Sequence, residues 1–148
     1  MARRVFFSFH YQRDIFRVNQ IRNIPNVTGC AAAGFQDASI WEDAEKKGPD
    51  AIKRLINDAL ENTTVTLVCI GAQTAGRTYI NYEIDKSIAQ GNGILGIKIH
   101  HLVGMDRTTD YEGDTPYKLT YYNYRVRKYT DVFDLASWIE EAAKAAGK

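Results

Sequence analysis

The sequence predicts a three-layer α/β fold in which a central, mostly parallel sheet is covered by helices on both faces. Short β-branched or aromatic segments alternate along the chain with segments whose apolar residues recur every three or four positions. Strands that alternate with helices form parallel sheets, because each helix carries the chain back to the same edge. With 148 residues, 45% of them hydrophobic, the chain is long enough for one domain, residues 1–148, with one core.

The first half of the chain is expected to begin with an aromatic strand and to end with an amphipathic helix. In order, the predicted elements are a strand at residues 5–9, a helix at 14–24, a weak strand around 34–35, a charged loop at 41–48 and a helix from Pro49. Proline suits the first turn of a helix, where its missing N–H would have no partner. The apolar residues that follow at helical spacing are Ile52, Leu55, Ile56, Ala59 and Leu60.

The second half continues the alternation. Its predicted elements are a strand at 65–70, a small-residue loop at 71–76, a helix at 77–90, a strand at 94–99, a polar segment at 104–116, an aromatic segment at 117–129 and a final helix. The β-branched run at 65–70 indicates a strand that is buried on both faces in the middle of the sheet. The aromatic segment is interpreted as packing on an edge strand. Thr130 and Asp131 suit the cap of the final helix.

Ligands of such sheets bind beyond the carboxyl ends of the strands. The segments at those ends are Ser8–His10, Ser39–Trp41, Gly71–Gly76 and His100–His101. For three side chains in or near these segments, the sequence allows two alternative roles. His10 either stabilises the chain locally or lines a ligand cleft. Asp14 is either the N-cap of its helix or a site residue. Trp41 either packs in a half-buried position or forms a wall of the cleft.

One carboxylate stands beside the apolar face of the helix predicted at 77–90. Isoleucines recur along this face, and Glu83 falls about 60° from Ile80 on a helical wheel. We expect an acid in this position to be only partly hydrated. It is therefore either paired with a cation, Arg77 or Lys86, or used in chemistry.

Charge and hydropathy patterns exclude several classes of protein. Nineteen basic and eighteen acidic residues nearly cancel, and no strongly basic segment indicates a nucleic-acid surface. No apolar run approaches the roughly 18 residues of a membrane span, and the N-terminus lacks the layout of a signal peptide. Two distant cysteines without a CxxC pattern favour a reduced, cytoplasmic location. The three histidines have no zinc-binding spacing, so no metal site is expected.

Residues 91–96 match the pattern G-x-G-x-x-G of dinucleotide-binding proteins. In those proteins the glycines follow a strand and open a helix. Here they follow a predicted helix and open a predicted strand, so we expect them to make no contact with phosphate. Gly91 is instead predicted to end its helix in a left-handed conformation, and Gly93 to form a turn.

Residues 5–14 and residues 65–83, the second of which ends in RTYINYE, together resemble the TIR-like domains of the Thoeris antiphage defence family, the ThsB component. The first is residues 5–14 (VFFSFHYQRD), a strand that runs into a loop and an Asp-led helix. The second is the strand at 65–70, its small-residue loop and the helix that begins RTYINYE and carries Glu83. The resemblance covers most of residues 4–140 and implies a TIR/flavodoxin-like fold.

The family carries a catalytic glutamate on this helix, so the resemblance implies that Glu83 acts in cleavage of NAD at the nicotinamide–ribose bond. The residues expected to bind the substrate are Ser8, Phe9, His10, Asp14, Trp41 and Tyr79. The first four belong to the first matching segment, and Tyr79 holds the position of an aromatic residue often found four residues before the glutamate. Trp41 is included because its ring is placed to stack on the substrate and exclude water. NAD is then the substrate, without a further cofactor.

In Thoeris defence the product is a cyclic ADP-ribose isomer that activates a separate effector enzyme. The resemblance therefore implies a cytoplasmic signal-producing enzyme whose partners are NAD and a product-activated effector protein. Self-association into a homo-oligomer stays open, and no nucleic-acid or membrane partner is expected. A lone glutamate suits the chemistry, which resembles glycoside hydrolysis, because nicotinamide departs as a neutral base and needs no general acid.

Two other functions remain open. Nucleoside 2-deoxyribosyltransferases also place a carboxylate at an N-glycosidic bond within an α/β fold. A non-catalytic TIR-like module would instead assemble with partners through its helices and surface loops, with Glu83 in a structural salt bridge.

Overall fold

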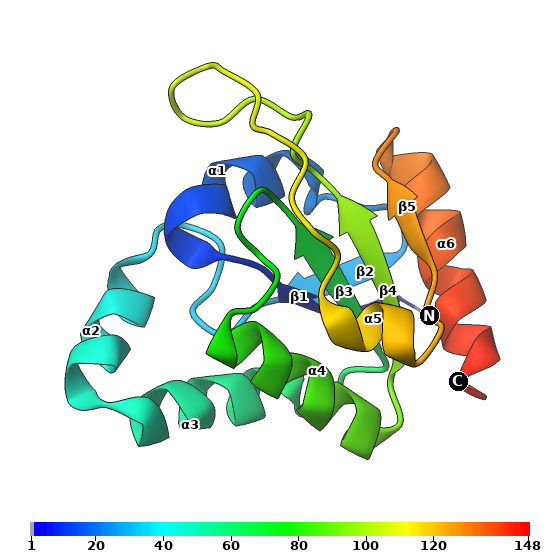
Figure 1. Ribbon diagram of the computed structural model, residues 1–148. Helices are drawn as coiled ribbons and strands as arrows, with labels where there is room; N and C mark the ends of the chain where they lie inside the picture. Colours follow the sequence, from blue (N-terminus) through cyan, green and yellow to red (C-terminus); the bar gives the residue numbers. More distant parts are fainter. Residues whose placement is uncertain (1) are drawn as a thin grey trace.

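The central sheet is fully parallel. In the computed structural model, which describes residues 2–148, five strands pair in the order β2-β1-β3-β4-β5 (Figure 1). The strands are β1 (Arg3–Ser8), β2 (Val27–Cys30), β3 (Val65–Ile70), β4 (Gly93–Lys98) and β5 (Val126–Lys128). The predicted α/β fold with a parallel sheet is confirmed, and β5 provides the edge strand expected within residues 117–129.

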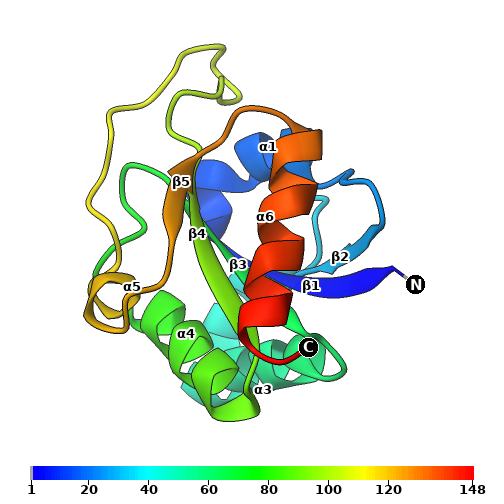
Figure 2. The ribbon, with the colours of Figure 1, turned by 90° about the vertical axis from the view of Figure 1, so that its right-hand side faces the viewer.

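Helices cover both faces of this sheet. They are α1 (Tyr11–Ile21), α2 (Ser39–Lys47), α3 (Pro49–Leu60), α4 (Thr78–Gln90), α5 (Tyr117–Tyr121) and α6 (Val132–Ala145). Figure 2 shows α4 and α5 on one side of the sheet and α6 on the other. None of the helices in residues 2–148 combines the length and the apolarity that crossing a membrane requires.

Strand β3 lies in the middle of the sheet and is buried along its whole length. Leu67 and Cys69 belong to the larger core, which includes side chains of α1 and α6. Val68 and Ile70 pack on the opposite face with Ile84 of α4. Burial on both faces explains why this strand reads as a nearly continuous apolar run in the sequence.

Residues 39–47 form helix α2, so the prediction of a loop at 41–48 is wrong. Trp41 and Ala44 are the buried side chains of this helix, and they stand three residues apart. The residues around them are mostly charged and exposed. A stripe of two apolar residues in nine gives little helical periodicity, because a surface helix normally shows three or four per two turns.

Two boundaries near the N-terminus also differ from the prediction. Helix α1 begins at Tyr11 with His10 as its N-cap, so the interpretation of Asp14 as an N-cap is wrong. The second strand pairs with β1 at residues 27–30 and not around 34–35. Gly34 has a φ of +84°, a left-handed conformation that an extended strand does not use.

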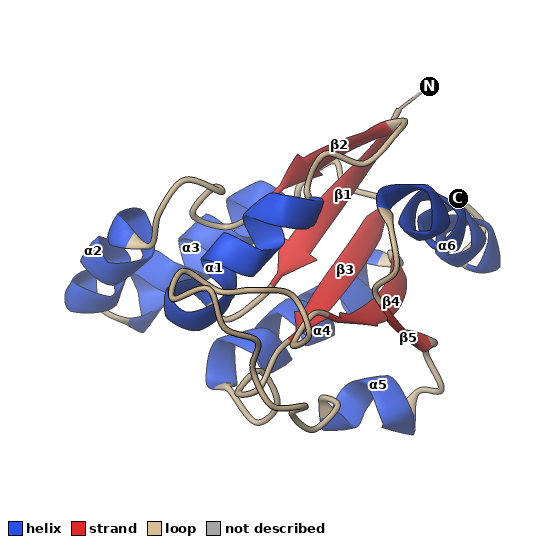
Figure 3. Ribbon diagram, turned by 90° about the horizontal axis from the view of Figure 1, so that it is seen from above, coloured by secondary structure: helices blue, strands red, loops and turns tan. Residues whose placement is uncertain are grey.

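The loops that follow the strands meet at one edge of the sheet, which Figure 3 views from above. The longest of them, residues 99–116, is held against α1 by two arginines. Arg13 donates two hydrogen bonds to Asp110, at 2.8 and 3.0 Å. Arg17 donates to the carbonyl of Leu102 at 2.9 Å. These contacts order a segment that the sequence predicts only as polar.

Candidate active site

A pocket of about 330 Å³ opens at the carboxyl end of β1, between α1, α2 and the first turn of α4. The predicted site residues that line it are Phe9, His10, Trp41, Tyr79 and Glu83. Its position agrees with the expectation that ligands bind beyond the carboxyl ends of parallel strands. Its volume lies at the lower end of the range of small-molecule sites, about 300–1,000 Å³.

Glu83 projects from α4 and is 1% exposed. Its Oε1 accepts a hydrogen bond from the Ser8 hydroxyl at 2.7 Å, and its Oε2 has no partner within the described residues. Neither Arg77 nor Lys86 forms an ion pair with it in that part of the chain. The expected partial hydration is also wrong, because the surrounding helix turn and strand bury the carboxyl completely.

Burial raises the pKa of Glu83 to about 8, and the hydrogen bond from Ser8 lowers it in part. A carboxyl removed from water favours its neutral form, unless a positive charge stands beside it. Without a ligand, Glu83 is therefore largely protonated at neutral pH. Acids that line a pocket, lack an ion-pair partner and have a strongly raised pKa are often found at functional sites.

His10 caps α1 and also lines the pocket. Its Nδ1 accepts a hydrogen bond from the Arg13 backbone N–H at 3.4 Å, which caps α1, and its ring lines the pocket. Burial, followed by the charges of Arg77 and Arg13, lowers the pKa of His10 to about 4. The ring is therefore neutral at physiological pH, and with Nδ1 accepting, its proton is carried by Nε2.

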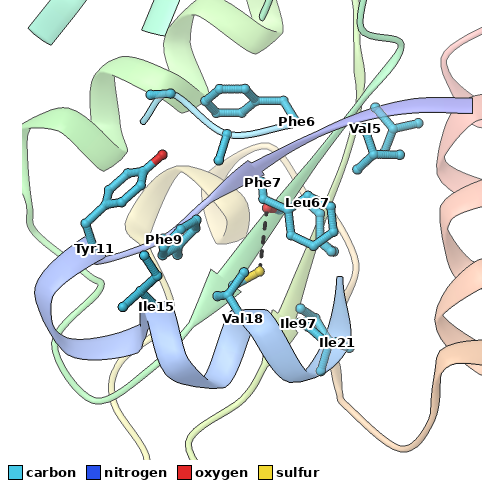
Figure 4. Packing of buried hydrophobic residues seen from close by; sticks show 14 of the residues in the cluster. Val5, Phe6, Phe7, Phe9, Tyr11, Ile15, Val18, Ile21, Leu67 and Ile97 are labelled. Carbon is cyan, nitrogen blue, oxygen red and sulfur yellow. Dashed lines mark hydrogen bonds between the residues drawn. The ribbon is translucent and has the colours of Figure 1, made fainter. Parts of the chain in front are cut away.

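Aromatic rings form one wall of the pocket. Tyr11 stacks on Trp41 with ring centroids 4.7 Å apart, and Trp41 meets Tyr79 edge-on at 5.6 Å. Phe9 packs against Tyr11 at 4.2 Å, and Figure 4 shows both rings within the core beside Ile15. Phe9 is only 2% exposed. Phe9 is therefore mainly a core residue. Truncation of a buried phenylalanine to alanine typically lowers the free energy of unfolding by about 3–5 kcal/mol.

Tyr11 also lines the pocket, although it is not among the site residues predicted from the sequence. Its hydroxyl accepts a hydrogen bond from the backbone N–H of Ala33 at 3.0 Å, and burial raises the pKa of the phenol. The only sequence signal was a tyrosine directly after His10 in the first matching segment. Tyr11 forms part of the pocket wall because Trp41, which belongs to α2, stacks on its ring.

Asp14 lies outside the pocket, so the structure does not support its predicted contact with substrate. Its Oδ1 accepts a hydrogen bond from Arg17 at 3.2 Å, and its carboxyl packs closely against Gly71. Burial raises the pKa of Asp14 to about 6, in spite of the charge of Arg17. Gly71 has no side chain there because a Cβ would overlap this carboxyl. Asp14 thus joins α1 to the loop after β3.

A second pocket, of about 380 Å³, lies at the opposite end of the sheet and is lined in part by Gly93, Arg127 and Trp138. It contains none of the predicted site residues. Arg127 is already engaged there, by Glu141 at 3.3 Å and by the ring of Trp138 at 5.1 Å. The pocket that contains the unpaired acid is therefore the better candidate for chemistry.

The three glycines of the literal G-x-G-x-x-G motif do not line the pocket that contains Glu83. Gly91 ends α4 with a φ of +81°, so the predicted left-handed cap is confirmed. Gly93 does not form a turn, which corrects that prediction. It is the first residue of β4, and a Cβ there would overlap the backbone of Ala142 in α6. This glycine is required by close packing of a helix on a strand.

Among residues 2–148, no group of three or more His, Cys, Asp or Glu side chains is arranged to hold a metal ion. The polar side chains that line the pocket include the acid of Glu83, the neutral imidazole of His10 and the guanidinium of Arg77, and aromatic rings form one of its walls.

Comparison with known proteins agrees with this arrangement. Residues 6–103 match the family described as the TIR-like domain of the Thoeris protein ThsB. Over 126 residues the chain is 49% identical to a candidate cyclic ADP-D-ribose synthase, ThsB1, of Bacillus cereus (strain MSX-D12). The match covers 84% of this chain and 66% of that protein. The chain therefore belongs to the family of TIR-like domains of the Thoeris protein ThsB.

Proposed function

We propose that this protein cleaves NAD at the nicotinamide–ribose bond and forms a cyclic ADP-ribose isomer. The observation that carries this proposal is the Oε2 atom of Glu83, which is buried beside a ligand-sized pocket and has no partner among residues 2–148. The similarity to a candidate cyclic ADP-D-ribose synthase supports the choice of substrate and product.

The reaction needs one carboxylate and no general acid. When the bond between ribose C1′ and the nicotinamide nitrogen breaks, its electron pair stays with the nitrogen, and nicotinamide leaves as a neutral molecule. The ribosyl group is left as an oxocarbenium-like cation. Glu83 stabilises this cation from a fixed position. A nucleophile in the same molecule then bonds to C1′ and releases its proton to water, which gives the cyclic product.

Substrate binding prepares the acid for this role. Without a ligand, burial keeps Glu83 mostly protonated below about pH 8. The nicotinamide ring of NAD is positively charged, and a positive charge at close range favours the carboxylate. Bound NAD thus favours the ionised form of Glu83, which assists cleavage. The released nicotinamide is neutral and no longer favours that form.

The aromatic wall determines the fate of the ribosyl cation in this proposal. Trp41 is 6% exposed and Tyr11 is 2% exposed, so these rings offer water little access from their side. If water attacks C1′, the product is linear ADP-ribose; if an internal nucleophile does, the product is cyclic. Exclusion of water favours the cyclic product.

In the cell, we propose that the cyclic product acts as a diffusible signal in antiviral defence and activates a separate effector protein. NAD is then consumed as a substrate and no other cofactor takes part. The proposal places the reaction in the cytoplasm, and two free cysteines, Cys30 and Cys69, fit a reducing compartment.

The first prediction tests the reaction itself. Incubation of the protein with NAD should release nicotinamide and yield a product with the mass of ADP-ribose less one water, both detected by mass spectrometry. The same protein should be isolated from phage-infected cells, so that an activating signal is included. Exchange of free bases on deoxynucleosides would point to a deoxyribosyltransferase. The absence of turnover with either substrate, from infected and uninfected cells alike, would leave a non-catalytic interaction module.

The second prediction concerns Ser8, which we assign as a positioning residue for Glu83. Removal of the hydroxyl in Ser8→Ala leaves both carboxyl oxygens without a donor, so the pKa of Glu83 should rise further. The pH at which kcat/KM for NAD reaches half of its plateau should therefore move upward. His10 is neutral across this range, so it does not contribute to the profile.

Ser8→Thr retains a hydroxyl and is the matched control for this measurement. Its pH midpoint should stay near that of the wild-type protein. A Ser8→Ala profile that lies on the wild-type curve would show that the hydrogen bond at 2.7 Å has no part in tuning the acid.

A further inference from the structure

We propose that Arg77 and the first turn of α4 bind the diphosphate of the substrate, so that the enzyme requires a nucleotide and discriminates against the nucleoside. This inference rests on the proposed function and adds an anion subsite to it. From the sequence, Arg77 is a possible salt-bridge partner of Glu83, but no such ion pair forms among residues 2–148.

The first turn of α4 presents unused hydrogen-bond donors to the pocket. Arg77 is the N-cap of this 13-residue helix, and no side chain caps it. The backbone N–H groups of Thr78, Tyr79 and Ile80 have no acceptor within the described residues. The residues of this turn line the same pocket as Glu83. Free N–H groups at the start of a helix, together with the helix dipole, favour an anion.

Arg77 brings a positive charge to this turn. The exposed side chain of Arg77 makes no ion pair among residues 2–148. Its charge nevertheless acts on the pocket, since it helps to lower the pKa of the buried His10. Glu45, an acid that also lines the pocket, accepts a hydrogen bond from Gln12 at 3.0 Å. A guanidinium beside free backbone donors is well suited to phosphate oxygens.

The buried, unpartnered Oε2 of Glu83 fixes where the reacting sugar must lie relative to this anion subsite. Glu83 follows Thr78 by five residues, which is about 7.5 Å along the helix axis. Side chains of a helix lean toward its N-terminus, so the carboxyl lies closer to the first turn than its Cα does. A ribose with its C5′ arm fits between them, with C1′ toward Glu83 and the 5′-phosphate toward Arg77.

This arrangement defines the substrate class. In NAD and in nicotinamide mononucleotide, a phosphate follows the reacting ribose, whereas nicotinamide riboside has only a hydroxyl there. The anion subsite therefore contributes to the binding of NAD and nicotinamide mononucleotide, and it contributes nothing to the binding of nicotinamide riboside. It also sets the direction in which the dinucleotide enters, with nicotinamide at the inner end of the pocket.

The third prediction compares Arg77→Gln with the wild-type protein. The variant should show a KM for NAD that is higher by about tenfold or more, the scale of a lost hydrogen bond to a charged group. Its kcat should remain within about twofold, because the contact is the same in the ground state and the transition state. Arg77→Lys should recover part of the affinity. Cleavage of nicotinamide riboside should be equal in the wild-type and Arg77→Gln proteins.

A binding measurement that needs no turnover accompanies the kinetics. Inorganic pyrophosphate should shift the amide NMR signals of Thr78, Tyr79 and Ile80, and Arg77→Gln should weaken its binding by about tenfold. Lys86→Gln is the matched control, since Lys86 is exposed on the same helix outside the pocket. It should bind pyrophosphate like the wild-type protein.

Two results would overturn the anion subsite: an unchanged KM for NAD in Arg77→Gln, or pyrophosphate shifts that appear elsewhere, for example at Arg125 and Arg127. A different result separates the two proposals. If pyrophosphate binds at α4 and depends on Arg77 while no nicotinamide is released from any substrate, the anion subsite is supported and the proposed reaction fails.

Discussion

A Glu83→Gln variant is expected to fold normally and to lose nicotinamide release from NAD by about a hundredfold or more, the scale of one removed electrostatic catalytic group. The amide has nearly the shape of the acid and can still accept the hydrogen bond from Ser8. It cannot carry the negative charge that opposes a developing ribosyl cation. Nicotinamide release should be followed at saturating NAD, so that the loss is assigned to kcat.

The matched control is Asp85→Asn. Asp85 lies two residues further along α4, is exposed and pairs with Lys118 at the surface. The same chemical change at this position should leave nicotinamide release unaltered. Full activity of a folded Glu83→Gln protein would end the assignment of Glu83 as the catalytic carboxylate.

Glu83→Gln should also become more stable relative to the wild-type protein as pH rises. The pKa of Glu83 is about 8 in the folded protein and has a usual value of 4.5. Between these two values the unfolded chain releases its proton first, so the wild-type free energy of unfolding falls as pH increases. The amide does not ionise and escapes this loss. Melting temperatures at pH 5 and pH 8 measure the difference.

The opposite stability result would be equally informative. If Glu83→Gln melted below the wild-type protein at pH 8, the carboxylate would be stabilised by a partner and would have a structural role. That outcome would favour the non-catalytic interaction module over the enzyme.

A Gly93→Ala variant is expected to lose about 3 kcal/mol of stability or more, at or beyond the upper end of typical overpacking costs. The added Cβ would overlap the carbonyl group of Ala142 and lie 3.0 Å from the backbone nitrogen of Ala143. Backbone atoms inside a helix cannot rotate away as a flexible side chain does, so α6 must move from the sheet. Urea unfolding measures this loss.

Gly91→Ala is the matched comparison for Gly93→Ala. Its Cβ would meet only the end of the Lys148 side chain, at 3.9 Å, but the φ of +81° imposes a left-handed conformation. That strain should cost about 1 kcal/mol. Equal losses for the two variants would contradict the close packing of α6 on β4. Neither glycine lines the Glu83 pocket, so the folded fraction of each should keep its KM for NAD.

The predictions that succeeded depend on strong local patterns. Residues 65–70 form a short apolar run with β-branched residues, and in the structure they are the buried central strand. The isoleucines beside Glu83 recur at helical spacing, and α4 buries that face. The prediction failed where local signals were weak, as in α2, whose buried face consists of Trp41 and Ala44 alone.

The candidate site shows the same division. The sequence places Glu83 beside an apolar face, yet it gives no measure of burial, because the hydration of an acid depends on residues distant in the chain. Ser8 lies 75 positions away and donates a hydrogen bond to the carboxyl. Asp14 carried the same resemblance as Ser8, but it turns toward Arg17 and Gly71 and away from the pocket.

By itself, the sequence determined the alternation of strands and helices, the family resemblance and the helix that carries the acid, because these follow from periodicity and short motifs within one segment. Only the tertiary structure decided that Glu83 is unpaired, that Tyr11 and Trp41 form a wall beside it, and that Arg77 faces the same pocket. These properties arise where separate segments meet. Burial, ion pairing and pKa depend on atoms that approach one another only after the chain has folded.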